Sequence, residues 1–304
     1  MGRLELAALP LCLALSGCPS DPPGRTDAAP SAAPSGPAAS AATSQPAATA
    51  QAGIPKTLIA QTLNPNSEPP YAGPTGTLRG VIRVEGDPPP SQSVSIPPGC
   101  GAAAATYDKL FRVGQDDTLA DVLVAVVGYR GYVPPKTDRQ SVDIFECAYS
   151  RRTVALTFGQ YLEVRNRDER RSYLPVLIGA RLPAKLVVAP KQAVKLYAPK
   201  PQRYLLVDEM GNRHMKADVF VLKYPTFQVT GLDGRYEIRG IPVGEAQVSA
   251  LLPAANMTVA RRKVTIAEGD NDVDLTIEID ASKLGGPSDA GPPPDASAAA
   301  SDGG

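Results

Sequence analysis

The stretch VTGLDGRYEIRGIPVGEAQVSALLP, from Val229 to Pro253, decides the fold of this chain. It contains Asp233-Gly234, the strongest short signal for a hairpin turn between two strands. A second turn follows at Pro242. After each turn, every second residue is one suited to a core: Tyr236 and Ile238 after the first, and Ala246, Val248 and Ala250 after the second. A period of two places such residues on one face of a strand. The stretch therefore predicts short strands that share a core and are joined by tight turns.

The segments before this stretch have the same strand character. DVLVAVVGY (121–129) is a nearly continuous apolar run, which is typical of a strand in a sandwich core. TLRGVIRVEG (77–86) alternates, and AVKLYAP (193–199) and ADVFVLKYP (217–225) each end at proline. No long stretch keeps a helical period. We therefore predict an all-β body over about residues 77–282, built as an antiparallel sandwich.

The two ends of the chain differ from this body in composition. An apolar run from Leu6 to Leu15 follows a basic residue and precedes small residues, which is typical of a secretory signal. The run is too short to cross a bilayer as a helix. Residues 19–76 and 283–304 are rich in Pro, Ala, Ser and Gly, so we predict a disordered stalk and a disordered tail. One apolar island at residues 54–61 is suited to dock on the body.

Charge and histidine content narrow the possible functions. The chain has 31 basic and 31 acidic residues, which gives no electrostatic reason to expect a nucleic-acid partner. His214 is its one histidine, and no nucleophile with a plausible base accompanies it. Phosphate-binding glycine loops and zinc spacings are also missing. We therefore expect a protein that is not an enzyme.

The residues around Cys18 carry a resemblance of their own. Leu15-Ser16-Gly17-Cys18 resembles the bacterial lipobox, in which the signal (here residues 1–18) is cut before a cysteine that is then lipidated. This resemblance implies a lipid anchor on Cys18 and a place in the bacterial cell envelope. Pro19 and Ser20 follow the cysteine, and neither is the aspartate that commonly retains such proteins at the inner membrane. The expected location is therefore the outer membrane, on its periplasmic or surface side.

The body resembles two known families. Residues 230–244 match the pattern T-x-x-D-G-x-Y-x-I-x-x-I-P-x-G of carboxypeptidase regulatory-like domains, which form a prealbumin-like sandwich. The body as a whole, and above all Gly159-Gln160-x-Leu-x-Val-x-Asn166-x-Asp168, resembles periplasmic plastocyanin-like (cupredoxin) proteins. The resemblance implies a cupredoxin-like antiparallel sandwich over 77–224. It is merged with or followed by regulatory-like strands over 225–282.

The plastocyanin-like family holds copper with two histidines, a cysteine and a weak methionine. The loop after Asp168, where the first histidine is expected, contains none. The cysteine position falls on Glu209 and the second histidine position on Asn212, and only Met215 matches. We therefore expect no cofactor and no retained metal site, with His214 and Met215 as weak candidates. The alternative for His214 is a solvated residue at the edge of a strand. It is spaced by two residues from Lys216 and Asp218, which places it on the same polar face of that strand.

The cysteines divide into two pairs. Cys12 lies in the signal and Cys18 is the proposed lipid site, which leaves Cys100 and Cys147 in the exported body. A pair in an oxidising compartment is most simply one disulfide. In the chain-entropy model such a bridge is worth about 4 kcal/mol. Two buried thiols are the alternative, and metal binding is a more distant one because no histidine accompanies the cysteines.

The densest basic patch consists of Arg165, Arg167, Arg170 and Arg171. Guanidinium groups suit carboxylate and phosphate, so the patch is a candidate site for an anion or a partner. The alternative is a solvated loop in which Asp168 and Glu169 lie between these arginines.

These observations favour a non-catalytic, lipid-anchored envelope protein. We expect its degenerate cupredoxin-like domain to act as a structural or binding module for a protein or polysaccharide partner. The alternative is a copper-binding or electron-transfer plastocyanin-like protein with altered ligands.

Overall fold

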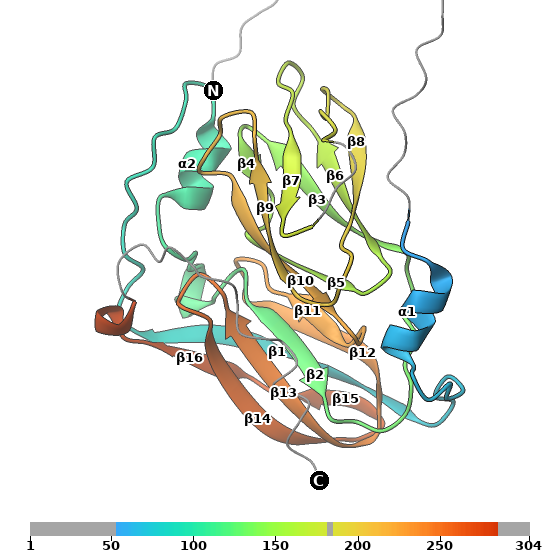
Figure 1. Cartoon of the computed structure of the whole chain (residues 1–304). Helices are drawn as coiled ribbons and strands as arrows, with labels where there is room; N and C mark the ends of the chain where they lie inside the picture. Colours follow the sequence, from blue (N-terminus) through green and yellow to red (C-terminus); the bar gives the residue numbers. More distant parts are fainter. Residues whose placement is uncertain (1–52, 181–184, 285–304) are drawn as a thin grey trace, which may run out of the picture. The chain divides into compact units, whose positions relative to one another are not determined.

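The computed structural model describes residues 53–180 and 185–284. The predicted signal peptide, Cys12, Cys18, most of the predicted stalk and nearly all of the predicted tail lie outside these residues. Regular structure in the described part is almost entirely strand (Figure 1), which confirms the all-β fold class. Its short helices are α1 (Lys56–Leu63), α2 (Gly101–Tyr107), η1 (Gln115–Asp117) and η2 (Ala281–Lys283).

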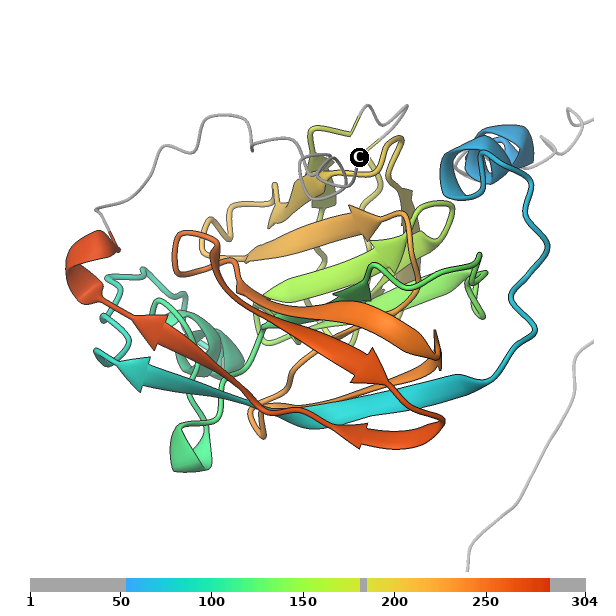
Figure 2. The ribbon, with the colours of Figure 1, turned by 90° about the horizontal axis from the view of Figure 1, so that it is seen from below.

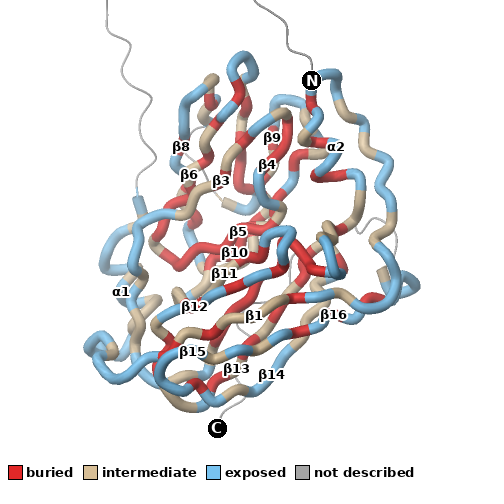
Figure 3. Tube along the Cα trace, turned by 180° about the vertical axis from the view of Figure 1, so that it is seen from behind, coloured by how far each residue is buried: buried red, intermediate tan, exposed pale blue. Residues whose placement is uncertain are grey.

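The first core lies between two sheets formed by strands from the middle of the chain. One sheet has the order β4-β3-β6-β8 and the other the order β5-β10-β9-β7. Their bounds are β3 (Arg139–Phe145), β4 (Ala148–Tyr149), β5 (Thr153–Thr157), β6 (Tyr161–Asn166), β7 (Pro175–Ile178), β8 (Ala193–Tyr197), β9 (Arg203–Asp208) and β10 (Lys216–Leu222). The alternating residues of β6 and β9 are buried, and so is every residue of β5 (Figure 3). The inward faces of both sheets therefore share one apolar cluster.

The second core lies between two sheets formed by strands from both ends of the described body (Figure 2). In one sheet β1 pairs with β12, β15 and β16, and the other has the order β11-β2-β13-β14. Their bounds are β1 (Thr75–Gly86), β2 (Leu123–Val127), β11 (Phe227–Val229), β12 (Arg235–Pro242), β13 (Gly244–Leu252), β14 (Thr258–Ile266), β15 (Gly269–Asp272) and β16 (Leu275–Ile279). Leucine, isoleucine and valine from both sheets fill the space between them.

The pairing differs from a purely antiparallel sandwich. β3 pairs with β6, β5 with β10, and β1 with both β15 and β16 in parallel. The remaining pairings are antiparallel, such as that of β13 with β14. Both cores are therefore mixed sandwiches. Residue alternation identifies the buried face of a strand but not the direction of its neighbour, so the sequence did not distinguish the two arrangements.

The turn at Asp233-Gly234 is present, but it does not form a hairpin. It connects β11 to β12, and these strands belong to the two opposing sheets of the second core. Gly234 has φ +63°, and a Cβ on it would lie 2.5 Å from the carbonyl oxygen of Ile82. Glycine is required there because the turn lies directly on the backbone of β1. The predicted alternation holds, since Tyr236 and Ile238 are buried in the core.

The two cores do not follow each other along the chain. The predicted boundary at residues 224 and 225 lies between β10 and β11, where the chain passes from the first core to the second. The strands β1 and β2, which we assigned to the first sandwich, pair with strands that follow residue 226. The first core is therefore an insertion between β2 and β11 of the second.

The apolar island of the predicted stalk forms α1 and packs on the first core. Ile54, Ile59 and Leu63 contact that core and are partly buried. Gly159, with φ +96°, leaves room for this contact, because a Cβ on it would lie 2.9 Å from the side chain of Ile59. Ordered structure therefore begins before residue 76, where the stalk was expected to end.

A buried ion pair lies next to β2, at the boundary between the two cores. Arg112 donates to both carboxylate oxygens of Asp121, over 2.7 and 2.8 Å. Asp121 also accepts the backbone N–H of Arg152, the residue just before β5, over 2.8 Å. The guanidinium of Arg152 in turn donates to the carbonyls of Lys109 and Leu110. One carboxylate of the second core thus fixes the start of a first-core strand.

Candidate functional site at the disulfide end of the first core

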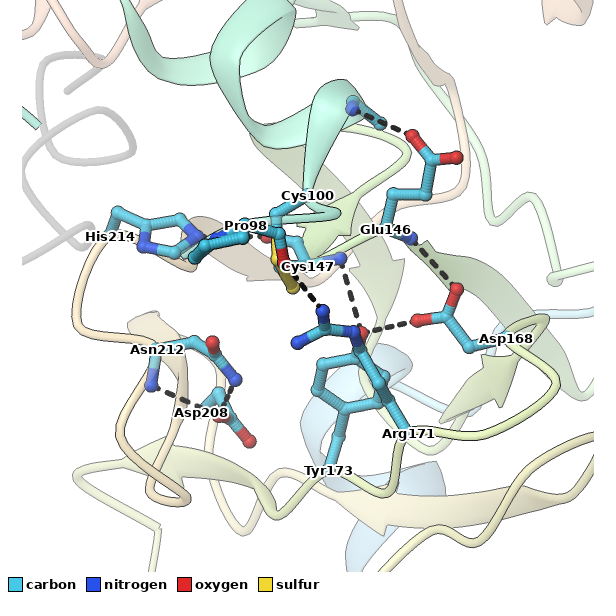
Figure 4. The surroundings of a disulfide bond; sticks show 11 residues. Pro98, Cys100, Glu146, Cys147, Asp168, Arg171, Tyr173, Asp208, Asn212 and His214 are labelled. Carbon is cyan, nitrogen blue, oxygen red and sulfur yellow. Dashed lines mark hydrogen bonds between the residues drawn. A yellow bond between two sulfur atoms is a disulfide. The ribbon is translucent and has the colours of Figure 1, made fainter. Parts of the chain in front are cut away.

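The predicted disulfide between Cys100 and Cys147 is present (Figure 4). Cys100 lies directly before α2, and Cys147 lies in the turn between β3 and β4. Their Cα atoms are 5.3 Å apart and both residues are buried. Because the positions are 47 residues apart in the chain, the bond fastens α2 and its preceding loop onto the first core.

A second set of buried bonds surrounds the disulfide. The hydroxyl of Tyr173 donates to Asp168 and accepts the backbone N–H of Cys147 over 3.1 Å. Asp168 also accepts the backbone N–H of Glu146 over 3.0 Å (Figure 4). Burial, followed by the bond to Asp168, raises the pKa of Tyr173 well above its ordinary value. Tyr173 therefore stays a neutral donor that links the loop after β6 to the turn that carries the disulfide.

The loop after β6 is the place where the plastocyanin-like resemblance expects the first copper histidine. The side-chain amide of Asn166 donates to the carbonyls of Arg171 and Val188, over 2.7 and 3.1 Å. Its oxygen accepts the backbone N–H of Asp168 over 3.0 Å. Asn166 is 1 % exposed, so these bonds replace hydration that burial removed. The loop is thus shaped by bonds between side chains and main chain.

The positions where the resemblance expects the other ligands are also held by contacts within the protein. Glu209 forms an ion pair with Lys185. The amide of Asn212 donates to Asp208 over 2.8 Å (Figure 4). Met215 is fully buried in the first core.

His214 lies next to Met215 but has different neighbours. Its Nε2 is 3.0 Å from the carbonyl oxygen of Cys147 and donates to it, since a carbonyl can only accept (Figure 4). The ring also meets that of Tyr107 edge-on, with centroids 5.5 Å apart. His214 is half-buried, whereas the alternative reading expected a solvated residue. Among residues 53–180 and 185–284, no group of three or more His, Cys, Asp and Glu side chains is placed to hold a metal ion.

The four arginines of the predicted anion or partner patch have different surroundings. Arg165 donates to both oxygens of Asp143, over 2.7 and 3.0 Å, and Arg167 donates to the same carboxylate over 3.0 Å. Arg171 donates to the carbonyl of Pro98 over 2.8 Å (Figure 4). Arg170 is exposed. The structure therefore brings two of the arginines together on one carboxylate, and the patch as a binding site stays a prediction.

Three buried tyrosines beside the disulfide were not predicted from the sequence: Tyr107, Tyr149 and Tyr173. The hydroxyl of Tyr107 accepts the backbone N–H of Tyr149 over 3.2 Å. The hydroxyl of Tyr149 itself is buried and has no hydrogen-bond partner among the described residues. Burial, then the nearby charge of Asp208, raises the pKa of Tyr149 well above its ordinary value. A local signal for the burial of Tyr149 was its place in Glu146-Cys-Ala-Tyr-Ser, two residues after the cysteine that was predicted to form the disulfide.

Comparisons with known proteins found no related sequence and solved structures of low similarity. No protein-family model matches the chain, and no curated protein sequence matches it either. Among solved structures, a reduced-state mutant of amicyanin is similar at 18 % identity, with a TM-score of 0.24, over 27 % of this chain and 80 % of that one. A Cu-containing nitrite reductase from Thermus scotoductus SA-01 is similar at 16 % identity and a TM-score of 0.24, over 32 % and 25 % of the two chains. Likeness at this level carries no argument about function.

The remaining resemblances stay predictions. No family model and no curated sequence matches the carboxypeptidase regulatory-like pattern or the lipobox. In the part of the chain that the structure describes, no helix is both long and apolar enough to cross a membrane.

Proposed function

We propose that this chain is a non-catalytic, lipid-anchored protein of the bacterial envelope. Its degenerate cupredoxin-like core serves as a rigid scaffold, and the body binds a protein or polysaccharide of the same compartment. The anchor would be Cys18 in the outer membrane, on its periplasmic or surface side, with the intervening stalk as tether.

One observation carries this proposal. The side chains at the places where the resemblance expects copper ligands are committed to bonds that hold the body together. Asn212 is bonded to Asp208, Glu209 is paired with Lys185, and Met215 is packed in the core. Tyr173 likewise fastens the loop after β6 to the turn of the disulfide. These contacts support a structural role for the former ligand region.

The alternative, a copper-binding protein with altered ligands, meets a geometric obstacle. The Nε2 of His214 is already bonded to the carbonyl of Cys147, and the neighbouring Met215 is buried among apolar side chains. A single ion that used both residues would need the backbone between them to turn. Soft and imidazole ligands must converge on one point to hold copper.

Copper titration of the purified chain distinguishes the non-metal scaffold from a copper-binding protein. We expect no visible absorption band from a Cu–thiolate bond and no stoichiometric retention of Cu²⁺ after gel filtration. His214→Ala should leave any residual weak binding by the protein unchanged. Tight binding of one copper per chain that is lost in His214→Ala would reverse the proposal.

Membrane fractionation tests the anchor. Cys18→Ala should move the protein from the membrane pellet to the soluble envelope fraction, because the acyl chains of a lipoprotein hold it in the bilayer. Cys12→Ala is the matched control and should remain in the pellet. Fractionation of Cys18→Ala with the membranes would count against the anchor and leave the copper test unaffected.

A further inference from the structure

A groove opens between three segments that are far apart in sequence. It is bordered by the residues after α1 (63–68), the loop after β2 (127–133) and the residues after β10 (223–224). Figure 1 shows α1 and the segment after it on the side where β2 ends. The volume is about 320 Å³, near the lower limit of about 300 Å³ for ligand sites in proteins. The lining relevant here consists of Tyr129, Tyr132, Tyr224, Asn66, Glu68 and Lys223.

The walls of the groove are held in place by hydrogen bonds. The backbone N–H of Tyr71 donates to the carbonyl of Tyr132 over 2.8 Å. The side chain of Asn64 bonds both the N–H and the carbonyl of Glu68, over 2.9 and 2.8 Å. Thr157 donates to the carbonyl of Tyr224 over 3.3 Å. A ligand would therefore meet a formed surface and would lose little of its binding free energy to ordering loops.

The tyrosine hydroxyls provide both kinds of hydrogen-bonding group. Thr226 donates its proton to the carbonyl of Val126 over 2.7 Å, so Tyr129 must be the donor in its 3.0 Å contact with the Thr226 hydroxyl. The oxygen of Tyr129 thus keeps a lone pair for an outside donor. The hydroxyl of Tyr224 has no partner among the described residues. Burial, with Tyr129 nearby, raises the pKa of Tyr224 to about 12, so the hydroxyl is a neutral donor and acceptor.

The polar residues at the rim are balanced in charge. Asn66, Glu68 and Lys223 are exposed, and their side chains make no hydrogen bond or ion pair within the described part of the chain. One acid and one base give no net charge, so the rim does not select for an anion or a cation. It does offer an amide, a carboxylate and an ammonium, which together donate and accept.

We propose that this groove binds a short segment of a neutral polysaccharide. A sugar ring has an apolar face of C–H groups, which suits the rings of Tyr129 and Tyr132, and a rim of hydroxyls that both donate and accept. Those hydroxyls match the hydroxyl of Tyr224 and the polar groups of Asn66 and Glu68. The inference rests on the proposed function as a binding module and names the chemical class of its partner.

Calorimetric titration of the purified full chain with cellohexaose, chitohexaose and maltohexaose tests the inference. At least one of these neutral oligosaccharides should bind. Tyr132→Ala, which removes a ring of the wall, should weaken that binding about tenfold. Tyr224→Phe, which removes only a hydroxyl, should weaken it about fivefold.

Phe145→Ala is the matched control, because Phe145 is an exposed aromatic residue at the end of β3, outside the groove. It should leave the affinity unchanged, and circular dichroism should show all three variants folded. Absence of binding to all three sugars, or equal affinities of the wild type and both groove variants, would overturn the inference.

A deca-proline peptide serves as a further probe, because aromatic grooves also recognise extended proline-rich chains. Binding of this peptide, weakened by Tyr132→Ala and without sugar binding, would overturn the polysaccharide assignment but keep the role as a binding module. Stoichiometric copper in the titration described above would instead overturn that role itself, so the two failures are distinguishable.

Discussion

Tyr149 and Tyr173 are both fully buried in the first core, but only Tyr173 has a partner for its hydroxyl. Tyr173→Phe would leave the carboxylate of Asp168 and the N–H of Cys147 without their bonds, so we expect a loss of about 2–3 kcal/mol in the free energy of unfolding. Tyr149→Phe removes a hydroxyl that was desolvated without compensation. We expect it to be neutral or to stabilise the protein by about 1 kcal/mol.

Urea unfolding of the two variants, under non-reducing conditions and followed by circular dichroism, measures this difference. The opposite signs are the informative result, because both substitutions remove one oxygen from a buried ring. A similar loss for Tyr149→Phe would mean that its hydroxyl bonds to something in solution, such as an ordered water.

Buried tyrosines also predict how stability changes at alkaline pH. Burial raises the pKa of Tyr107 from 10.0 to about 12, and that of Tyr224 likewise to about 12. The folded state therefore keeps the phenol proton more tightly than the unfolded chain. Stability should be constant below about pH 10 and then fall by about 1.4 kcal/mol per pH unit for each of these tyrosines, up to about pH 12.

Urea midpoints measured between pH 8 and pH 11.5 check this alkaline loss. The total slope should exceed that of these two residues, because burial raises the pKa values of Tyr129, Tyr204 and Tyr236 in the same direction. Tyr107→Phe should make the fall shallower. A midpoint that stays constant up to pH 11.5 would contradict the shifted pKa values.

At the scale of single residues, the disulfide was predictable from the sequence, whereas the buried contacts around it were not. Cys100 and Cys147 were predicted to pair because the other two cysteines fall in the predicted signal and lipobox, and they are bonded. The bonds of Tyr173 with Asp168 and Cys147 could not be predicted, because they join positions whose separation in space depends on how β6 packs on the turn after β3. The same holds for the contact of His214 with Cys147.

The strand β14 lies at the end of its sheet, where it pairs only with β13. Arg261, Arg262 and Lys263 are consecutive and exposed in the middle of this strand. An edge strand has unpaired backbone N–H and C=O groups, and charged side chains keep other strands from adding to it. We interpret the three cations as protection of this edge.

This interpretation predicts the effect of removing the charge. The double substitution Arg261→Val with Lys263→Val should cause self-association at concentrations where the wild type is monomeric, measured by light scattering and sedimentation. The charge-preserving control Arg261→Lys with Lys263→Arg should behave as the wild type does. A monomeric valine variant would show that the edge is shielded by something other than charge.

At the scale of elements, strands and turns were predictable but strand partners were not. The alternation in Tyr236 and Ile238 identified the buried face of β12, and Asp233-Gly234 identified the turn. Nothing in that stretch indicates that β12 pairs with β1, because hydrophobic alternation is the same for any neighbour. The turn was therefore predicted as a hairpin, although it crosses from one sheet to the other.

Asp121 bonds across the boundary between the two cores, where Leu123 and Val229 of the second core also pack on Ala155 and Phe220 of the first. The side chain of Asp121 is 5 % exposed and that of its partner Arg112 is 17 % exposed, so the pair is shielded from water. Asp121→Ala would leave a buried guanidinium without its anion and should lower the free energy of unfolding by about 3–5 kcal/mol. Because Asp121 also accepts the N–H of Arg152, the substitution removes one bond between the cores, while the apolar contact between them remains.

Asp143→Ala is the matched control, because Asp143 also pairs with arginine, namely Arg165 and Arg167, but is 29 % exposed. Water screens these pairs, so we expect a loss of about 1 kcal/mol or less. Calorimetric unfolding of both variants provides the comparison. Equal losses would show that the burial of the Asp121 pair adds nothing to its contribution to stability.

The insertion of one core into the other has a consequence for the newly made chain. Every strand of the first core lies between Arg139 and Leu222, whereas β1 pairs with strands that are more distant in sequence and end at Ile279. Contacts between distant positions form late in folding, since long loops must close first. During synthesis the inserted core can thus fold early, while the edges of β1 stay unpaired until its C-terminal partners are made. A chain truncated after Leu222 should already protect β3 to β10 from pulse proteolysis and leave β1 cleavable. The C-terminal strands would therefore determine when the whole body becomes resistant to proteases.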